Sequence, residues 1–270
     1  MEQTFDTTGG LHLEVHIPAG TIQIRAEETL QTHVSIQGER SPEDFRIVMD
    51  DLPGGGHHLT VEYRERNKRF GWRGSDLRVN LTIPLGTTVT CDTGSADLEV
   101  SGAIRTLTFR SGSGDCRFDD IDGEVSVKVA SGDVAGTTVG GGLSFTSASG
   151  DVRMRQVSGD IVGKVVSGDI SLGTIGGSAR LASVSGDVEI GSIATGLTSI
   201  RSVSGDVEIG VARGTRVYLD INSTSGETVC DLDMTEMAGG SGGPDVELQV
   251  GTVSGDIRIV RSTTAANADR

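Results

Sequence analysis

The chain has 270 residues, of which 40 are glycine, while aromatic residues make up only 3%. The glycines follow no triplet repeat, which excludes collagen, and the many Val, Ile, Thr and Ser residues indicate narrow, repetitive β-structure. A formal net charge of −15 argues against a broad surface for nucleic acid or anionic membranes. No stretch approaches the roughly 18 consecutive apolar residues of a membrane span.

The N-terminal region reads as a set of β-strands. Apolar and polar residues alternate through 11–17, 21–27 and 32–38, as in strands with one buried face. The segments 59–65 and 76–86 flank a short loop, and we expect them to form a β-hairpin. We therefore expect residues 1–93 to form a β-strand cap, which protects the open end of a repeat domain from aggregation.

Two groups of residues in this region are candidate binding sites. The loop at 63–74 interleaves basic and aromatic side chains, which can seat phosphates or acidic polymers; the alternative is a solvated hairpin loop. The predicted partner-binding residues are Arg64, Arg66, Arg69, Phe70, Trp72 and Arg73. His12 and His16 share a strand face with Glu14, which suits either a metal ion or a polar surface in water.

From residue 94 the chain repeats in units of nine residues, and the nonamer SVSGDVEIG stands both at 183–191 and at 202–210. The consensus is Gly, Asp, apolar, any, apolar, any, any, apolar or small, Ser. Positions three and five share one face of a strand, and we expect a bend that turns position eight inward as well. Gly and Asp make a second bend, because Gly tolerates positive φ and Asp bonds local backbone.

A longer period of 18 or 19 residues is superimposed on the nonamer. It is carried by the aspartates Asp97, Asp115, Asp133, Asp151, Asp169, Asp187 and Asp206. Nine residues are too few to enclose two sheets that stand about 10 Å apart, whereas 18 give a perimeter of ~60 Å. The pattern predicts an all-β fold, a β-solenoid of 18-residue coils built from nonapeptide halves over residues 94–260, rising ~4.8 Å per coil. An antiparallel meander with nine-residue arms is the alternative.

The Ser-Gly-Asp corners are the predicted structural turns. They are Ser113, Gly114, Asp115, Ser131, Gly132, Asp133, Ser149, Gly150, Asp151, Ser167, Gly168, Asp169, Ser185, Gly186, Asp187, Ser204, Gly205 and Asp206. Carboxylates stacked about 5 Å apart repel one another and need compensation. Either each accepts N–H groups of its turn, which we expect, or calcium lies between coils on the ladder Asp115, Asp133, Asp151, Asp169, Asp187 and Asp206.

The repeat loosens toward the C-terminus. Residues 223–232 keep one coil, in which Glu227 replaces Asp, and 233–245 read as a flexible, Gly-rich insertion. Residues 246–260 restore a last coil, and 261–270 are expected to form a disordered tail.

The stretch LRVNLTIPLGTTVTCDTGSADLEVSG at 77–102, followed by serial SGDV corners, resembles the bacterial "putative adhesin" family. The likeness covers nearly the whole chain. It implies a β-solenoid without established catalytic activity, and an adhesin, an intracellular scaffold or a regulatory partner in envelope-stress signalling.

The sequence predicts a non-catalytic interaction or scaffold protein that needs no cofactor. It contains no phosphate loop, dinucleotide fingerprint or metalloprotease motif, and its three cysteines match no disulfide or zinc pattern. The alternative is a β-helix protein that binds or acts on polysaccharide. The carboxylates that could act on a glycosidic bond, or form an ordinary acidic turn, are Asp119, Asp120, Asp122 and Glu124.

The predicted partner is an unknown protein or a surface polymer rather than nucleic acid, and self-association is a further option. The opening MEQTFDTTGG has no apolar signal segment. We therefore expect a cytoplasmic protein; a surface or secreted location would require a leader outside this sequence.

Overall fold

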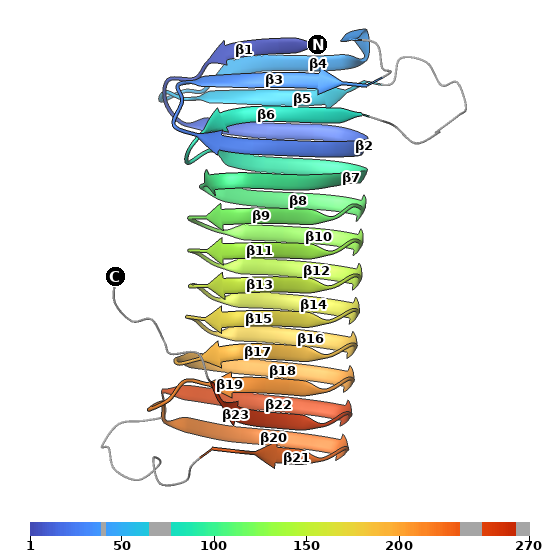
Figure 1. Cartoon of the computed structure of the whole chain (residues 1–270), viewed down its shortest axis with the longest axis vertical. Helices are drawn as coiled ribbons and strands as arrows, with labels where there is room; N and C mark the ends of the chain where they lie inside the picture. Colours follow the sequence, from blue (N-terminus) through green and yellow to red (C-terminus); the bar gives the residue numbers. More distant parts are fainter. Residues whose placement is uncertain (39–41, 65–76, 233–244, 263–270) are drawn as a thin grey trace, which may run out of the picture. The chain divides into compact units, whose positions relative to one another are not determined.

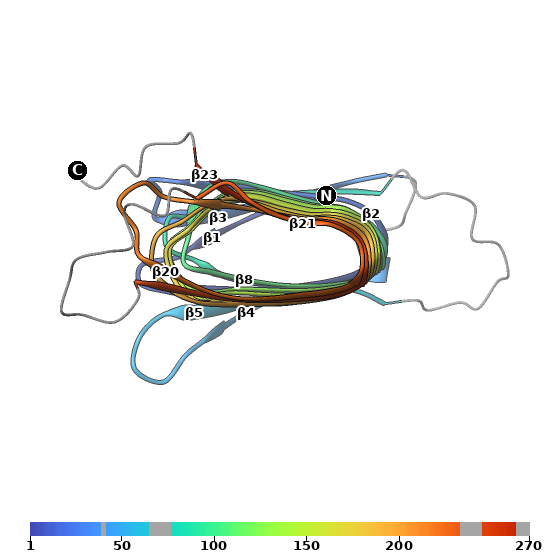
Figure 2. The ribbon, with the colours of Figure 1, turned by 90° about the horizontal axis from the view of Figure 1, so that it is seen from below.

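The computed structural model describes residues 1–38, 42–64, 77–232 and 245–262 (Figure 1). The chain divides into two compact units, Met1–Gly136 and Thr137–Arg270. Each unit is built mainly from parallel strands in two facing layers, and a tight bend on one side joins the layers (Figure 2). Parallel pairing at the 18-residue spacing excludes the meander and confirms the predicted β-solenoid.

The first unit combines a non-repetitive start with the first regular coils. A short 3-10 helix spans Pro42–Asp44, and one strand, β11 (Val134–Val139), crosses the boundary between the units. The remaining strands are β1 (Glu2–Asp6), β2 (Leu11–Glu27), β3 (Gln31–Gln37), β4 (Phe45–Asp51), β5 (His57–Tyr63), β6 (Arg78–Pro84), β7 (Thr88–Ile104), β8 (Thr106–Ser113), β9 (Cys116–Ile121) and β10 (Val125–Ser131).

The predicted hairpin between residues 59–65 and 76–86 is wrong. β5 pairs in parallel with the first half of β2, whereas β6 pairs in parallel with its second half, beyond a bend at Gly20, whose φ is 121°. The hairpin of this region is β4–β5, which is antiparallel and closed by a Gly-rich turn at 52–56. Because β2 offers a partner to both segments, β5 and β6 are separated into opposite layers (Figure 2).

The second unit is a more regular stack. Residues 18 positions apart lie side by side, for example Leu143, Ile161 and Ala179. Its strands are β12 (Leu143–Ser149), β13 (Val152–Val157), β14 (Ile161–Ser167), β15 (Ile170–Ile175), β16 (Ala179–Ser185), β17 (Val188–Ile193), β18 (Gly196–Ser204), β19 (Val207–Val211), β20 (Val217–Ser225), β21 (Thr228–Cys230), β22 (Val246–Ser254) and β23 (Ile257–Arg261).

The expectation that position eight always turns inward is correct for only one of the two nonapeptide halves. In β13, two consecutive exposed residues reverse the parity, so that Val157 at position eight is buried. β14 instead alternates regularly up to Val165 at position seven, which leaves Val166 at position eight 53% exposed. The half that contains β14 therefore needs no bend before its corner at Ser167.

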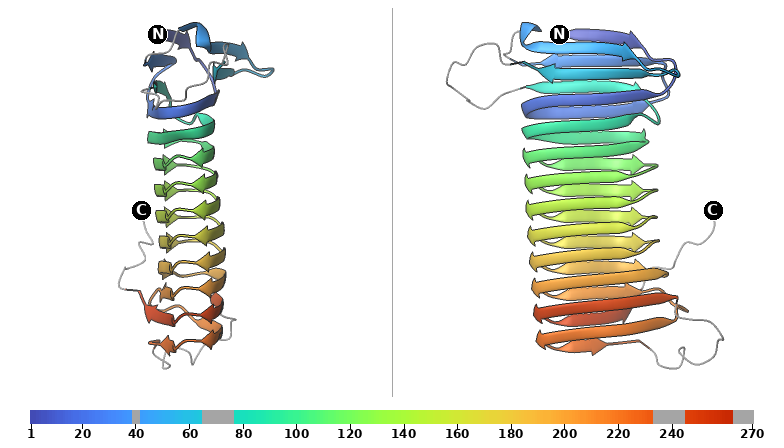
Figure 3. Two further views of the ribbon diagram at one scale, coloured as in Figure 1. Left: turned by 90° about the vertical axis from the view of Figure 1, so that its right-hand side faces the viewer. Right: turned by 180° about the vertical axis from the view of Figure 1, so that it is seen from behind.

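The order of the coils at the end of the second unit departs from the order of the sequence. The strands β22 and β23, the last of the described strands, lie between the coil β18–β19 and the coil β20–β21 (Figure 3). The prediction that residues 246–260 form the last coil is therefore wrong in space, because β20–β21 takes the end position. Both segments carry the corner motif, so the repeat pattern alone fits either order.

Asp245 fixes the entry into this intercalated coil. Its Oδ1 accepts a hydrogen bond from Nη2 of Arg216 at 2.9 Å, and its Oδ2 accepts one from the backbone N–H of Arg216 at 3.1 Å. On the other side, its carbonyl oxygen accepts the N–H of Gly196 at 3.0 Å. The side-chain bond from Arg216 is the largest cause that holds the pKa of Asp245 below its ordinary value.

The predicted limit of the cap, between residues 93 and 94, falls inside β7, whose two halves lie on β8 and β9. The same strand lies along β2 from His12 to Arg25. Most of the predicted insertion (233–244) and most of the predicted tail (263–270) lie outside the described residues.

Candidate functional site

The corner aspartates of the second unit form a ladder of hydrogen bonds between coils. Oδ1 of each residue accepts the backbone N–H of the corner residue in the adjacent coil, not an N–H of its own turn. The distances are 2.9 Å from Asp169 to Asp151, 2.9 Å from Asp187 to Asp169, 2.8 Å from Asp206 to Asp187, 2.8 Å from Asp256 to Asp206 and 2.7 Å from Glu227 to Asp256. The first unit repeats the arrangement, with 3.0 Å bonds from Asp115 to Asp97 and from Asp133 to Asp115.

The corner glycines allow these close stacks. Gly186 has a φ of 125°, and a Cβ there would collide with the carbonyl oxygen of Gly168 in the next coil. Its N–H donates to the carbonyl oxygen of Ser204 at 3.2 Å. Glycine is needed at this position both for the positive φ and for the approach of one corner to the next.

The negative charge of the ladder carboxylates is stabilised by the backbone N–H groups that donate to Oδ1. For Asp151, the N–H of Asp169 is the largest cause of a lowered pKa, and the 2.6 Å ion pair with Arg153 lowers it further. Within the described ranges, no three His, Cys, Asp or Glu side chains are arranged to hold a metal ion. The geometry thus gives Oδ1 of the ladder aspartates a hydrogen-bond partner within the protein.

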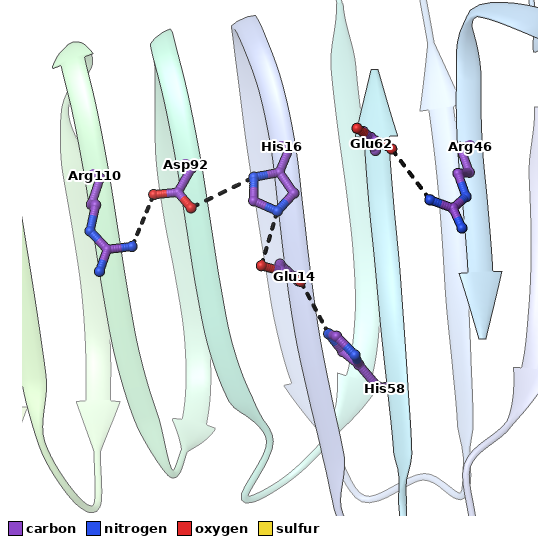
Figure 4. A network of polar contacts seen from close by, with 7 residues as sticks. All are labelled: Glu14, His16, Arg46, His58, Glu62, Asp92 and Arg110. Atoms are coloured by element: carbon purple, nitrogen blue, oxygen red, sulfur yellow. Dashed lines mark hydrogen bonds and ion pairs between the residues drawn. The ribbon is translucent and has the colours of Figure 1, made fainter. Parts of the chain in front are cut away.

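A row of polar and charged side chains crosses five strands of the first unit (Figure 4). Arg46, Glu62, His16, Asp92 and Arg110 are successive register partners on β4, β5, β2, β7 and β8. Ion pairs of 3.7, 3.6 and 3.2 Å join Arg46 to Glu62, His16 to Asp92 and Arg110 to Asp92. Opposite charges in neighbouring strands stabilise a sheet by roughly 0.2–1 kcal/mol per pair. The pairs Arg46–Glu62 and Arg110–Asp92 therefore help to hold their strands together.

Glu14 extends the row to a second histidine. Its two carboxylate oxygens lie 3.1 Å from Nε2 of His16 and 3.2 Å from Nε2 of His58 (Figure 4). The trio considered from the sequence is thus replaced by a bridge in which His58, from β5, takes the place proposed for His12. Both imidazoles are engaged by a carboxylate, which suits a polar surface network.

A polar hollow of about 280 Å³ lies on the opposite layer of the same unit, over β6, β2 and β7. Nε2 of Gln23 donates to Glu99 at 3.0 Å, and the Ser101 hydroxyl donates to the carbonyl oxygen of Ile24 at 3.3 Å. Two register rows of polar side chains line the hollow, Asn80–Gln23–Glu99 and Thr82–Arg25–Ser101. Amide, hydroxyl, guanidinium and carboxylate groups converge here on a surface that water can enter.

An apolar ridge runs across the second unit, formed by the position-eight residues of successive coils. Ser149, Ser167, Ser185, Ser204 and Ser254, which follow them, are register partners. The valines of the ridge are 48–53% exposed. The ridge consists of Ala148, Val166, Val184, Val203 and Val253. One exposed valine is ordinary, but a column with one in each adjacent coil is a continuous apolar strip.

The predicted partner-binding loop falls almost wholly outside the described residues, which include only Arg64 of that set. Its Nε lies 3.2 Å from Glu62, and its N–H donates to the carbonyl oxygen of Asp44 at 2.6 Å. The rest of the set remains a prediction: Arg66, Arg69, Phe70, Trp72 and Arg73.

The carboxylates considered for catalysis lie on the surface of the first unit. Asp119, Asp120, Asp122 and Glu124 are all exposed, on β9 and the corner after it. Burial raises the pKa of the thiols of Cys91 and Cys116, which favours their protonated form. These cysteines therefore belong to the core.

Sequence reasoning missed the hollow, the row of polar and charged side chains and the ridge. The first two depend on how strands far apart in the chain align, and no local pattern gives that alignment. The ridge had a signal, because valine recurs before Ser-Gly-Asp in three successive corners, at Val166, Val184 and Val203. The expectation that position eight faces inward concealed it.

Parallel 18-residue coils with inter-coil corner bonds place the protein in the class of β-solenoids. The family model described as Toastrack DUF4097 matches residues 11–260, and the chain belongs to this family. The chain thus falls in a family of unknown function.

Several solved structures are similar over nearly the whole chain. One, titled "putative lipid binding protein", is from Parabacteroides distasonis, at 16% identity, 96% coverage of both chains and a TM-score of 0.46. Two titled "putative adhesin" come from Bacteroides fragilis (12% identity, 96% of both chains, TM-score 0.44) and P. distasonis (10%, 96% of both chains, 0.42). Comparison with curated proteins returns no match. Among the described residues, no helix is long and apolar enough to cross a bilayer.

Proposed function

We propose that this protein is a non-catalytic, adhesin-like scaffold that holds a partner along a rigid β-solenoid surface. The observation that carries the proposal is the apolar ridge from Ala148 to Val253. Its side chains project from consecutive, hydrogen-bonded strands, so a partner that binds there meets a preformed surface and loses little free energy in ordering it.

The surroundings of the ridge support a contact with a protein or polymer. The exposed corner serines beside the valines provide hydroxyl groups that can donate or accept hydrogen bonds. On the next outward position of the same strands, Lys164 and Arg201 add positive charge to an otherwise acidic chain. An apolar strip with a polar and charged rim is the usual anatomy of an interaction surface.

The test is an affinity pull-down from the native host with a variant that carries Val184→Asp and Val203→Asp. The control is Val162→Asp, because Val162 is 42% exposed and projects from β14 outside the ridge. We expect the ridge variant to lose a partner that the wild type and the control retain, with all three melting at similar temperatures. Identical partner profiles would contradict the proposal.

The polar hollow favours a second candidate function, the binding of a polysaccharide. Sugars present closely spaced hydroxyls, which the carboxylate of Glu99, the guanidinium of Arg25 and the amide of Asn80 can each hydrogen-bond. A glycan array is the first measurement, followed by titration of any hit with Glu99→Gln and Asn80→Ala variants. Binding that these variants leave unchanged would exclude the hollow as its site.

The same glycans test the non-catalytic part of the proposal. We expect no release of reducing ends during prolonged incubation. Turnover that depends on Asp119 or Asp120 would instead establish a polysaccharide-acting enzyme. We further propose a cytoplasmic location, which fractionation of the native host with antibodies to the protein would test.

A further inference from the structure

Among the described residues, the coil β20–β21 forms one edge of the second unit. Among the described strands, β22 is the only partner of β20, and β23 is the only partner of β21. An edge strand presents a row of unpaired N–H and C=O groups, to which another strand can add. The inward side chains of β20 are also less buried than those of its neighbour. Leu219 and Ile221 are half-buried, while their register partners Leu248 and Val250 are 0% and 2% exposed.

The sequence of β20 is complementary to itself in the antiparallel sense. β20 spans Val217–Ser225, so a two-fold axis at its midpoint, Ile221, pairs all nine of its residues with those of a second copy. In that register Asp220 lies opposite Asn222, Tyr218 opposite Thr224 and Leu219 opposite Ser223. An axis at Asp220 would instead set two carboxylates against each other, which is unfavourable.

We propose that β20 is a dimerisation edge, at which a second copy of this chain adds its own β20 in antiparallel register about a two-fold axis at Ile221. The contact is isologous, so it closes after two copies and does not extend into a fibre. The two Ile221 side chains meet at the axis and cover each other. The inference is independent of the ridge and of the proposed function.

The test uses two substitutions of opposite effect at one exposed position. Because of the two-fold symmetry, each substitution of Asn222 acts twice, opposite Asp220 of the other copy. Sedimentation velocity of the full chain, from low to high micromolar concentration, gives the dimer dissociation constant. Asn222→Asp creates two like-charge pairs and should weaken the dimer roughly 2- to 30-fold, whereas Asn222→Lys creates two opposite-charge pairs and should strengthen it by a similar factor.

Matched controls separate this register from a general effect of charge. Thr146→Asp and Thr146→Lys make the same changes at an exposed position of β12, away from the edge, and should leave the dissociation constant unchanged. Melting temperatures show whether every variant is folded. As a geometric check, Ile221→Cys in a Cys230→Ser background should form a disulfide-linked dimer on oxidation. A monomer at every concentration, or a dimer that is indifferent to the charge at residue 222, would overturn the proposal.

Discussion

The hydrogen-bond ladder at the corners makes a prediction that separates the role of an acceptor from the role of a charge. Asp187 stands in the middle of it, with its N–H bonded to Asp169 and its Oδ1 accepting the N–H of Asp206. Asp187→Asn keeps an acceptor oxygen but removes the charge, while Asp187→Ala removes both. The two variants should therefore differ in stability.

The magnitudes follow from opposing terms. Replacing a charged acceptor by a neutral one costs about 1 kcal/mol of hydrogen-bond energy. At a spacing of ~4.8 Å, the charge repels each ladder neighbour by about 0.9 kcal/mol in water, which salt at ~0.15 M reduces to about half. For Asn, the two terms nearly cancel, so we expect the free energy of unfolding to change by less than about 0.5 kcal/mol. Ala loses the whole bond and should cost a net 1–2 kcal/mol, or roughly 3–6 °C in Tm.

The assay is thermal and urea unfolding of the wild type and both variants at low and high NaCl, with circular dichroism as the measure of unfolding. Added salt should stabilise the wild type more than Asp187→Asn, because only the wild type carries the full column of charges. If Asn destabilised the protein as much as Ala, the charge itself would be required and the acceptor argument would be refuted. If Ala were neutral, the inter-coil bond would contribute nothing to stability.

Three further predictions concern metal, pH and packing. EDTA should leave Tm unchanged, and a large calcium-dependent rise in Tm would contradict the assignment of the ladder aspartates to hydrogen bonds between coils. Arg216 lowers the pKa of Asp245, so this carboxylate stabilises the fold above pH ~4, and that contribution is lost as pH falls through its folded-state pKa. The Asp245→Asn variant should therefore lose less Tm than the wild type when the pH is lowered through this range. Equal losses of Tm would contradict a stabilising contact between Arg216 and Asp245. In Gly163→Ala the new methyl group would overlap the buried ring of Phe145, so the free energy of unfolding in urea should fall by about 1–3 kcal/mol. In the control Gly251→Ala the methyl group meets open space, and stability should change by less than about 0.5 kcal/mol. Similar effects of the two substitutions would refute the packing argument.

The solenoid could be predicted from the sequence because each coil repeats the same local instructions. Alternating apolar residues define the strand faces, and Gly168 or Gly186 marks a corner that only glycine fits. The 18-residue spacing of the aspartates then gives the size of the coil. Repetition makes the registers of neighbouring coils identical, so one local rule determines many long-range contacts.

The rest depends on choices among equivalent partners. Nothing local distinguishes β22 from β20 as the neighbour of β18, since β18 and β20 both pair with β22 in the same corner register. In the first unit, β2 serves partners from three later segments, so the row of polar and charged side chains through His16 exists only once their registers are set. Even the ladder was foreseen as a bond within each turn, although the acceptor reaches the adjacent coil.

The intercalation of β22–β23 has a consequence for how the protein is made. A ribosome releases residues 217–230 before residues 246–261, yet the permanent neighbour of the earlier segment is the later one. Until residues 246–261 have been made, the segment 217–230 lacks the strands with which it pairs in the folded protein. A stop codon just before residue 245 would therefore leave the end coil β20–β21 in the chain and remove the coil β22–β23, with which it pairs.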